Sequence, residues 1–89
     1  MITPVQCRMA RAALNWGVRD LAREANVNPS TVTRIEAGGK AIPATLAAIQ
    51  RTLEGAGVIF IDENGEGPGV RLRKLKSAGT VSRASLREQ

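Results

Sequence analysis

Apolar side chains recur every three or four positions through the first 55 residues, which is the spacing of helices that bury one face. Start signals divide this stretch into four short helices, which begin at Thr3-Pro4, at Val18, at Asn28-Pro29 and at Pro43. Thr and Asn cap a helix by accepting from a free backbone N–H, and Pro suits the first helical position. The first helix is predicted to turn five residues inward, Val5, Met9, Ala12, Ala13 and Trp16.

The second half of the chain changes to the pattern of strands. Residues 58–61 form the run Val-Ile-Phe-Ile, and residues 70–73 alternate between apolar and basic side chains. Residues 63–69 between them are turn formers or charged, so we expect a β-hairpin over residues 58–75. Because residues 58–61 are apolar on both faces, we expect the hairpin to pair with that of a second chain. The alternative is that it packs on the fourth helix of its own chain.

The predicted fold class is therefore mainly α, with four short helices followed by a C-terminal β-hairpin and a basic tail. Since 89 residues support one core, residues 1–57 are expected to form the principal domain, with residues 58–75 as a dimerisation element. Residues 76–89 are polar and rich in small side chains, so we expect a flexible tail.

Composition favours binding over catalysis. The chain has no His, no Tyr and only Cys7, so the usual general bases, nucleophile partners and metal ligands are scarce. We expect no enzyme activity, no cofactor, no metal and no small-molecule ligand, with Cys7 serving as a packing residue. The longest apolar run is strand-sized and no secretory leader is evident, so we expect a cytoplasmic protein without a membrane span.

The net charge of +5 is unevenly distributed along the chain. Residues 1–69 hold seven basic and seven acidic side chains, whereas residues 70–89 hold six basic side chains and one acidic side chain. A basic surplus at one end favours a partner that carries phosphates.

Residues 18–38 carry the most specific motif of the chain. Two predicted helices separated by Asn26-Val27-Asn28 have the spacing of a helix-turn-helix. The motif resembles the Cro/CI, or xenobiotic-response-element (XRE), family of regulators at Leu21-Ala22, Ala25, Val27, Thr31-Val32 and the run from Arg34 to Gly38. The resemblance implies a lambda-repressor-like fold that binds double-stranded DNA with its third helix.

The resemblance also implies that Pro29, Ser30, Thr33 and Arg34 reach DNA, and we add Thr31 and Arg19 to these candidate DNA-binding residues. Arg34 can bond bidentately to guanine, Ser30 suits several bases, and Pro29 can contact a thymine methyl. Thr31 or Thr33 could hold a phosphate. The family further implies that Arg11 pairs with Glu36 and so orients the third helix.

The chain departs from the family at Gly17-Val18, where a Ser or Thr followed by Gln is usual. One phosphate anchor is therefore missing. Either Arg19 replaces it or the domain has lost the usual DNA contacts.

We expect a homodimeric repressor or controller protein that binds a short palindromic operator. The alternative is a protein-interaction module, such as an antiactivator, coactivator or antitoxin. A third possibility uses charge alone, with the tail binding RNA or anionic lipid.

Overall fold

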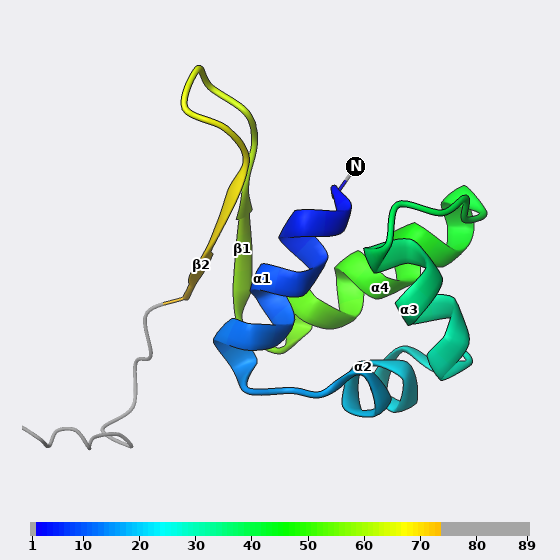
Figure 1. Ribbon diagram of the computed structural model, residues 1–89. Helices are drawn as coiled ribbons and strands as arrows, with labels where there is room; N and C mark the ends of the chain where they lie inside the picture. The colour runs from blue at the N-terminus through cyan, green and yellow to red at the C-terminus, as the bar shows by residue number, and fades with distance from the viewer. Residues whose placement is uncertain (1, 74–89) are drawn as a thin grey trace, which may run out of the picture.

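The computed structural model describes residues 2–73, which form four helices and a two-stranded antiparallel hairpin (Figure 1). The elements in chain order are α1 (Pro4–Leu14), α2 (Val18–Ala25), α3 (Pro29–Glu36), α4 (Pro43–Gly55), β1 (Val58–Ile61) and β2 (Gly69–Leu72). This arrangement confirms the predicted fold class. The expected flexible tail and the last two residues of the expected hairpin lie outside the described residues.

α1 begins where the sequence predicts, because Thr3 and Gln6 satisfy each other's backbone groups. The Thr3 hydroxyl accepts from the Gln6 N–H at 3.1 Å, and the Gln6 side-chain oxygen accepts from the Thr3 N–H at 3.0 Å. The helix ends at Asn15, which adopts the left-handed conformation with φ 59°. Trp16 therefore follows the helix, although it still packs beside the core.

The predicted inward face of α1 is wrong. The buried residues are Gln6, Cys7 and Ala10, whereas Val5 is 48% exposed and Ala12 and Ala13 are exposed. Small side chains on the inner face allow close packing, and the Gln6 amide can be buried because all of its polar atoms find partners. The spacing of apolar residues alone predicts that a neighbouring face of α1 is the buried one.

The turn between α2 and α3 follows the sequence signals. Asn26 ends α2 with φ 59°, and the Asn28 side chain caps α3 by accepting from the Ser30 N–H at 2.9 Å. α2 and α3 pack against each other, and each contributes a fully buried side chain to the core, Leu21 and Val32. One core joins all four helices and the first strand, with the fully buried side chains Cys7, Leu21, Val32, Ile49, Leu53 and Val58 as its largest members.

The hairpin packs on α1 and α4 of its own chain. Val58 pairs with Leu72 and Ile61 with Gly69, so β2 begins one residue earlier than predicted. The Gln6 side-chain amide donates to the carbonyls of Ile61 and Gly69, at 3.1 and 3.0 Å, and so ties the loop end of the hairpin to α1. Whether the hairpin also pairs with a second chain stays a prediction. No helix within residues 2–73 is long and apolar enough to cross a membrane.

Candidate nucleic-acid interface

α3 turns four of the six sequence-predicted DNA-binding residues outward. Pro29, Ser30, Thr33 and Arg34 are exposed, while Val32 and Ile35 anchor the opposite face of the helix in the core. α3 thus presents a polar face to the outside while α2 packs against it.

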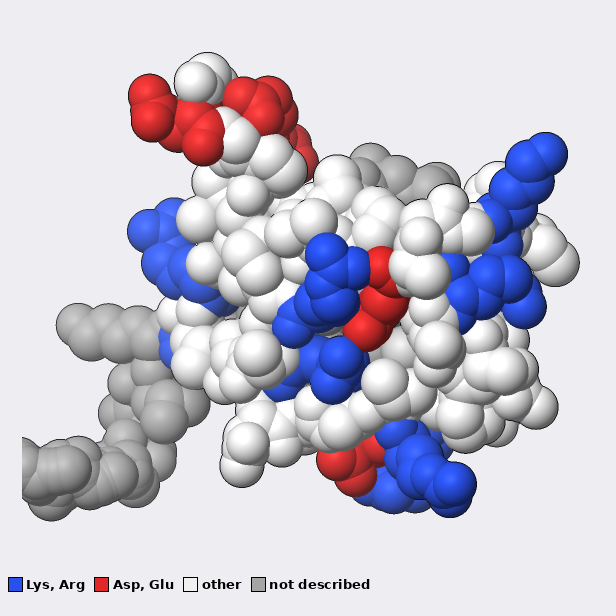
Figure 2. Space-filling model, in the orientation of Figure 1, with Lys and Arg blue, Asp and Glu red and all other residues white. Residues whose placement is uncertain are grey.

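The other two predicted residues differ in their placement. Thr31 is partly buried on α3, so its side chain suits a contact with the DNA sugar-phosphate backbone better than one with a base edge. Arg19 is exposed on α2 and so stands apart from the α3 group. Basic side chains lie in separate groups on the face shown in Figure 2, and the acidic hairpin loop stands away from them.

Arg34 is held in place by the loop that follows α3. Its Nε donates to the Lys40 carbonyl at 3.1 Å, and its own carbonyl accepts from the Gly39 N–H at 2.8 Å. A Cβ added at Gly39 would lie 2.6 Å from Arg34 Cγ and 3.0 Å from Arg34 O. Gly39 is therefore required by the close passage of the loop against the Arg34 stem, which limits the positions of the guanidinium.

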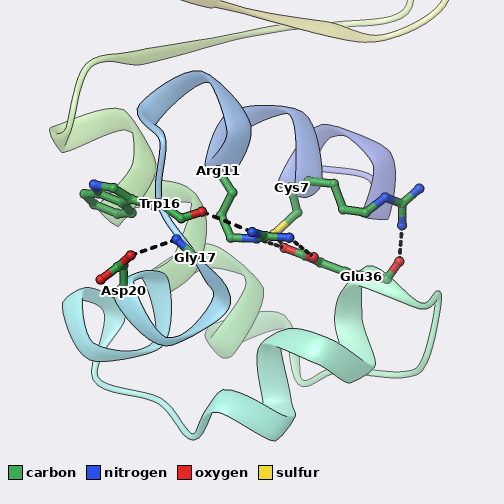
Figure 3. A network of polar contacts seen from close by, with 7 residues as sticks. Cys7, Arg11, Trp16, Gly17, Asp20 and Glu36 are labelled. Carbon is green, nitrogen blue, oxygen red and sulfur yellow. Dashed lines mark hydrogen bonds and ion pairs between the residues drawn. The ribbon is translucent and has the colours of Figure 1, made fainter.

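The Arg11–Glu36 pair implied by the family resemblance is confirmed. Arg11 Nε and Nη2 donate to the two carboxylate oxygens of Glu36, at 2.7 and 2.8 Å, in a bidentate arrangement (Figure 3). Arg11 Nη1 also donates to the Trp16 carbonyl at 3.1 Å. One guanidinium thus joins α1, the segment before α2 and the C-terminal end of α3, which fixes the direction of α3.

Two further residues complete this network, and sequence reasoning missed their roles. Arg8 Nη1 donates to the Glu36 carbonyl, and Cys7 Sγ donates to Glu36 Oε2 at 3.4 Å. Burial, reinforced by the nearby Glu36 charge, raises the pKa of the Cys7 thiol to about 12, so the thiol stays protonated and able to donate. The available signal for Arg8 was its position three residues before Arg11, which places both on one side of α1.

At the start of α2, the side chain of Asp20 bonds the backbone of Gly17. The Asp20 carboxylate accepts from the Gly17 N–H at 2.7 Å and from Arg23 Nη2 at 3.0 Å. The backbone hydrogen bond, followed by the Arg23 bond, lowers the pKa of Asp20. Gly17 contributes no side chain that could cap the first turn of α2, so the Asp20–Gly17 bond is only one half of a capping box.

Comparison with known proteins agrees with this geometry. A helix-turn-helix model of the Cro/CI (XRE) type matches residues 8–53, which is more than half of the chain and includes α2, the turn, α3 and most of α1 and α4. No curated protein matches the chain. The matched segment holds both the outward face of α3 and the Arg11–Glu36 bond that orients it. The chain therefore belongs to the Cro/CI-type helix-turn-helix family and carries a DNA-binding domain of the kind found in regulators.

Proposed function

We propose that the protein is a sequence-specific transcriptional repressor or controller protein that inserts α3 into the major groove of double-stranded DNA. The observation that carries the proposal is the outward face of α3, with Ser30, Thr33 and Arg34 exposed on a helix whose direction is fixed by the Arg11–Glu36 bond. A rigid helix with short polar side chains and one positioned arginine fits direct readout of base edges.

Each residue of the face has an assigned contact. Arg34 donates to the O6 and N7 of guanine, Ser30 bonds a neighbouring base, and Pro29 packs on a thymine methyl. Thr31 and Thr33 hold phosphates of the DNA backbone beside the contacted bases. Arg19, exposed near the start of α2, contributes a phosphate contact in place of the side chain that Gly17 lacks.

The operator is first recovered by selecting bound duplexes from a random pool. Arg34→Ala is then expected to weaken operator binding by about 1–3 kcal/mol and to relax preference at one base pair.

Arg19→Ala should weaken binding to all sequences alike and reduce the slope of log affinity against log salt concentration by about one. Arg51→Ala, which removes an exposed arginine from α4, is the matched control and should leave sequence preference unchanged.

Two outcomes would contradict parts of this assignment. An equal loss on operator and unrelated DNA would reassign Arg34 to a phosphate. A failure to recover any preferred duplex would favour the alternative of a protein-interaction module. The specific observation behind that alternative is the start of α2, where Gly17 offers no side chain and the Asp20 carboxylate takes the backbone N–H.

A further inference from the structure

The chain leaves α3 through a reversal made by two glycines. Gly38 adopts the left-handed conformation with φ 89°, and its N–H donates to the Ile35 carbonyl at 3.0 Å. The Gly39 N–H donates to the Arg34 carbonyl at 2.8 Å. These two bonds form the Schellman arrangement, in which the second residue after the C-cap lies beside the last turn of the helix. The reversal therefore brings Gly39 and Arg34 together.

The backbone conformation of Gly39 does not itself require glycine. Its φ lies outside the left-handed range, so the conformation is open to residues that carry a side chain. In the Schellman arrangement an apolar side chain at this position frequently packs on the last turn of the helix. Here a Cβ on residue 39 would lie 2.6 Å from Arg34 Cγ and 3.4 Å from Arg34 Cδ. The stem of Arg34 thus occupies the space that such a side chain would need.

A second contact holds the outer part of the same side chain. Arg34 Nε donates to the Lys40 carbonyl at 3.1 Å, so the loop meets Arg34 both at the stem and at the guanidinium. Arg34 is nevertheless exposed, and an exposed arginine ordinarily samples many rotamers. Holding the side chain in place before DNA arrives reduces the entropy that is lost on binding.

The bond at Nε also limits how the guanidinium can meet a base. A guanidinium is a planar fork of five N–H donors. When the Nε–H is directed to Lys40, the pair of parallel donors that remains is formed by Nη1 and Nη2 at the end of Arg34. Two parallel donors match the O6 and N7 acceptors that guanine presents in the major groove.

We propose that Gly39 is a specificity-determining residue, because it holds Arg34 so that Nη1 and Nη2 meet guanine while Nε stays bonded to Lys40. Gly39 touches no base and acts only through Arg34. The inference rests on the proposed reading of DNA by α3 and adds that residue 39 must be glycine for full discrimination at that base pair. A larger residue displaces the Arg34 stem but leaves the charge unchanged, so affinity for unrelated DNA is kept.

Nuclear magnetic resonance of the arginine Nε–H groups tests the hold on the full chain without DNA. The Arg34 signal, identified by its loss in Arg34→Ala, should show less motion and slower exchange with water than that of Arg51, which is exposed on α4. Gly39→Ala should bring the Arg34 signal close to that of Arg51 in both properties. Gly55→Ala is the matched control, because a Cβ added there meets nothing within 4 Å, and it should leave the Arg34 signal unchanged.

A double-mutant cycle on the selected operator tests the effect on sequence preference. Gly39→Ala should reduce discrimination at the Arg34 base pair by about threefold to tenfold, which is the cost of ordering one long side chain on binding. Affinity for unrelated DNA should change by less than about twofold. In the Arg34→Ala background, Gly39→Ala should have no further effect on discrimination. The added Cβ also lies 3.0 Å from the Arg34 carbonyl, but this contact is present in both backgrounds, so a shift of the loop cancels in the comparison.

Three results would contradict the proposal in distinguishable ways. A wild-type Arg34 Nε–H as mobile as that of Arg51 would show that the loop does not hold the side chain. Discrimination that Gly39→Ala leaves unchanged, or reduces equally in both backgrounds, would overturn the role of Gly39 and leave the reading of DNA by α3 intact. If no operator is recovered, the proposed function fails and the role of Gly39 in reading fails with it, whatever the resonance measurement shows of the hold.

Discussion

At the scale of single residues, Glu36 has the most demanding environment described. It is 7% exposed and accepts from both Arg11 and Cys7, so its charge is compensated by hydrogen bonds rather than by water. Glu36→Gln removes the charge and one good acceptor, and it should lower the free energy of unfolding by about 1.5–3 kcal/mol. Urea titration followed by circular dichroism measures the change.

The matched control is Glu24→Gln on α2, where the acid is exposed and lies 3.8 Å from Arg23. That substitution should change stability by no more than about 0.5 kcal/mol. Equal effects of the two substitutions would mean that the Arg11–Glu36 bond contributes no more than a surface ion pair.

Contacts between individual side chains could be predicted only where the family motif implies them. The family resemblance implied the Arg11–Glu36 bond, and the structure confirms it. The bonds of Arg8 and Cys7 to Glu36 span 28 and 29 positions. Apart from the position of Arg8 three residues before Arg11, nothing in the local sequence marks these contacts. The contacts of the six predicted DNA-binding residues stay predictions, because they depend on the partner.

At the scale of elements, the hairpin depends on one buried amide. Gln6 donates to carbonyls on both strands while accepting from the Thr3 N–H, so Gln6→Ala leaves three backbone groups without this partner. Stability should fall by about 1–3 kcal/mol. Amide hydrogen exchange should show β1 and β2 losing more protection than α2, because the link between hairpin and helix is lost first.

Gln50→Ala is the control for this prediction. Gln50 bonds Glu54 at 3.2 Å within α4, and its loss should cost no more than about 0.5 kcal/mol. If the hairpin and α2 lose protection equally in Gln6→Ala, the amide supports the whole domain rather than the hairpin.

Helix boundaries could be predicted from the sequence because a capping residue bonds backbone groups only a few positions away. Thr3, Asn28 and Pro43 mark helix starts, and Gly38 follows α3 with φ 89°, a conformation that favours glycine. The inward face of α1 was not readable, because burial of Gln6 depends on carbonyls of a hairpin more than 50 positions away. A polar residue that is buried through distant partners resembles a surface residue in any local pattern.

At the scale of the whole molecule, charge is divided between the folded domain and the segment that follows. Residues 1–73 hold nine basic and seven acidic side chains, whereas residues 74–89, outside the described part, hold four basic side chains and one acidic side chain. The surplus is thus +2 for the first segment and +3 for the second. Any DNA affinity that is independent of sequence should depend strongly on residues 74–89.

Removing residues 74–89 should therefore weaken binding to unrelated DNA. The slope of log affinity against log salt concentration should become less steep by up to about 3–4, since each phosphate contact contributes about 0.9 to that slope. Preference for the operator over unrelated DNA should persist, because the face of α3 is intact. The control is removal of residues 80–89, which deletes two Arg and one Glu and should change the slope little. Fluorescence anisotropy over a range of salt concentrations measures both slopes. If the two truncations leave the slope of the full chain unchanged, this segment makes no contact with DNA, and the domain itself must supply every phosphate contact.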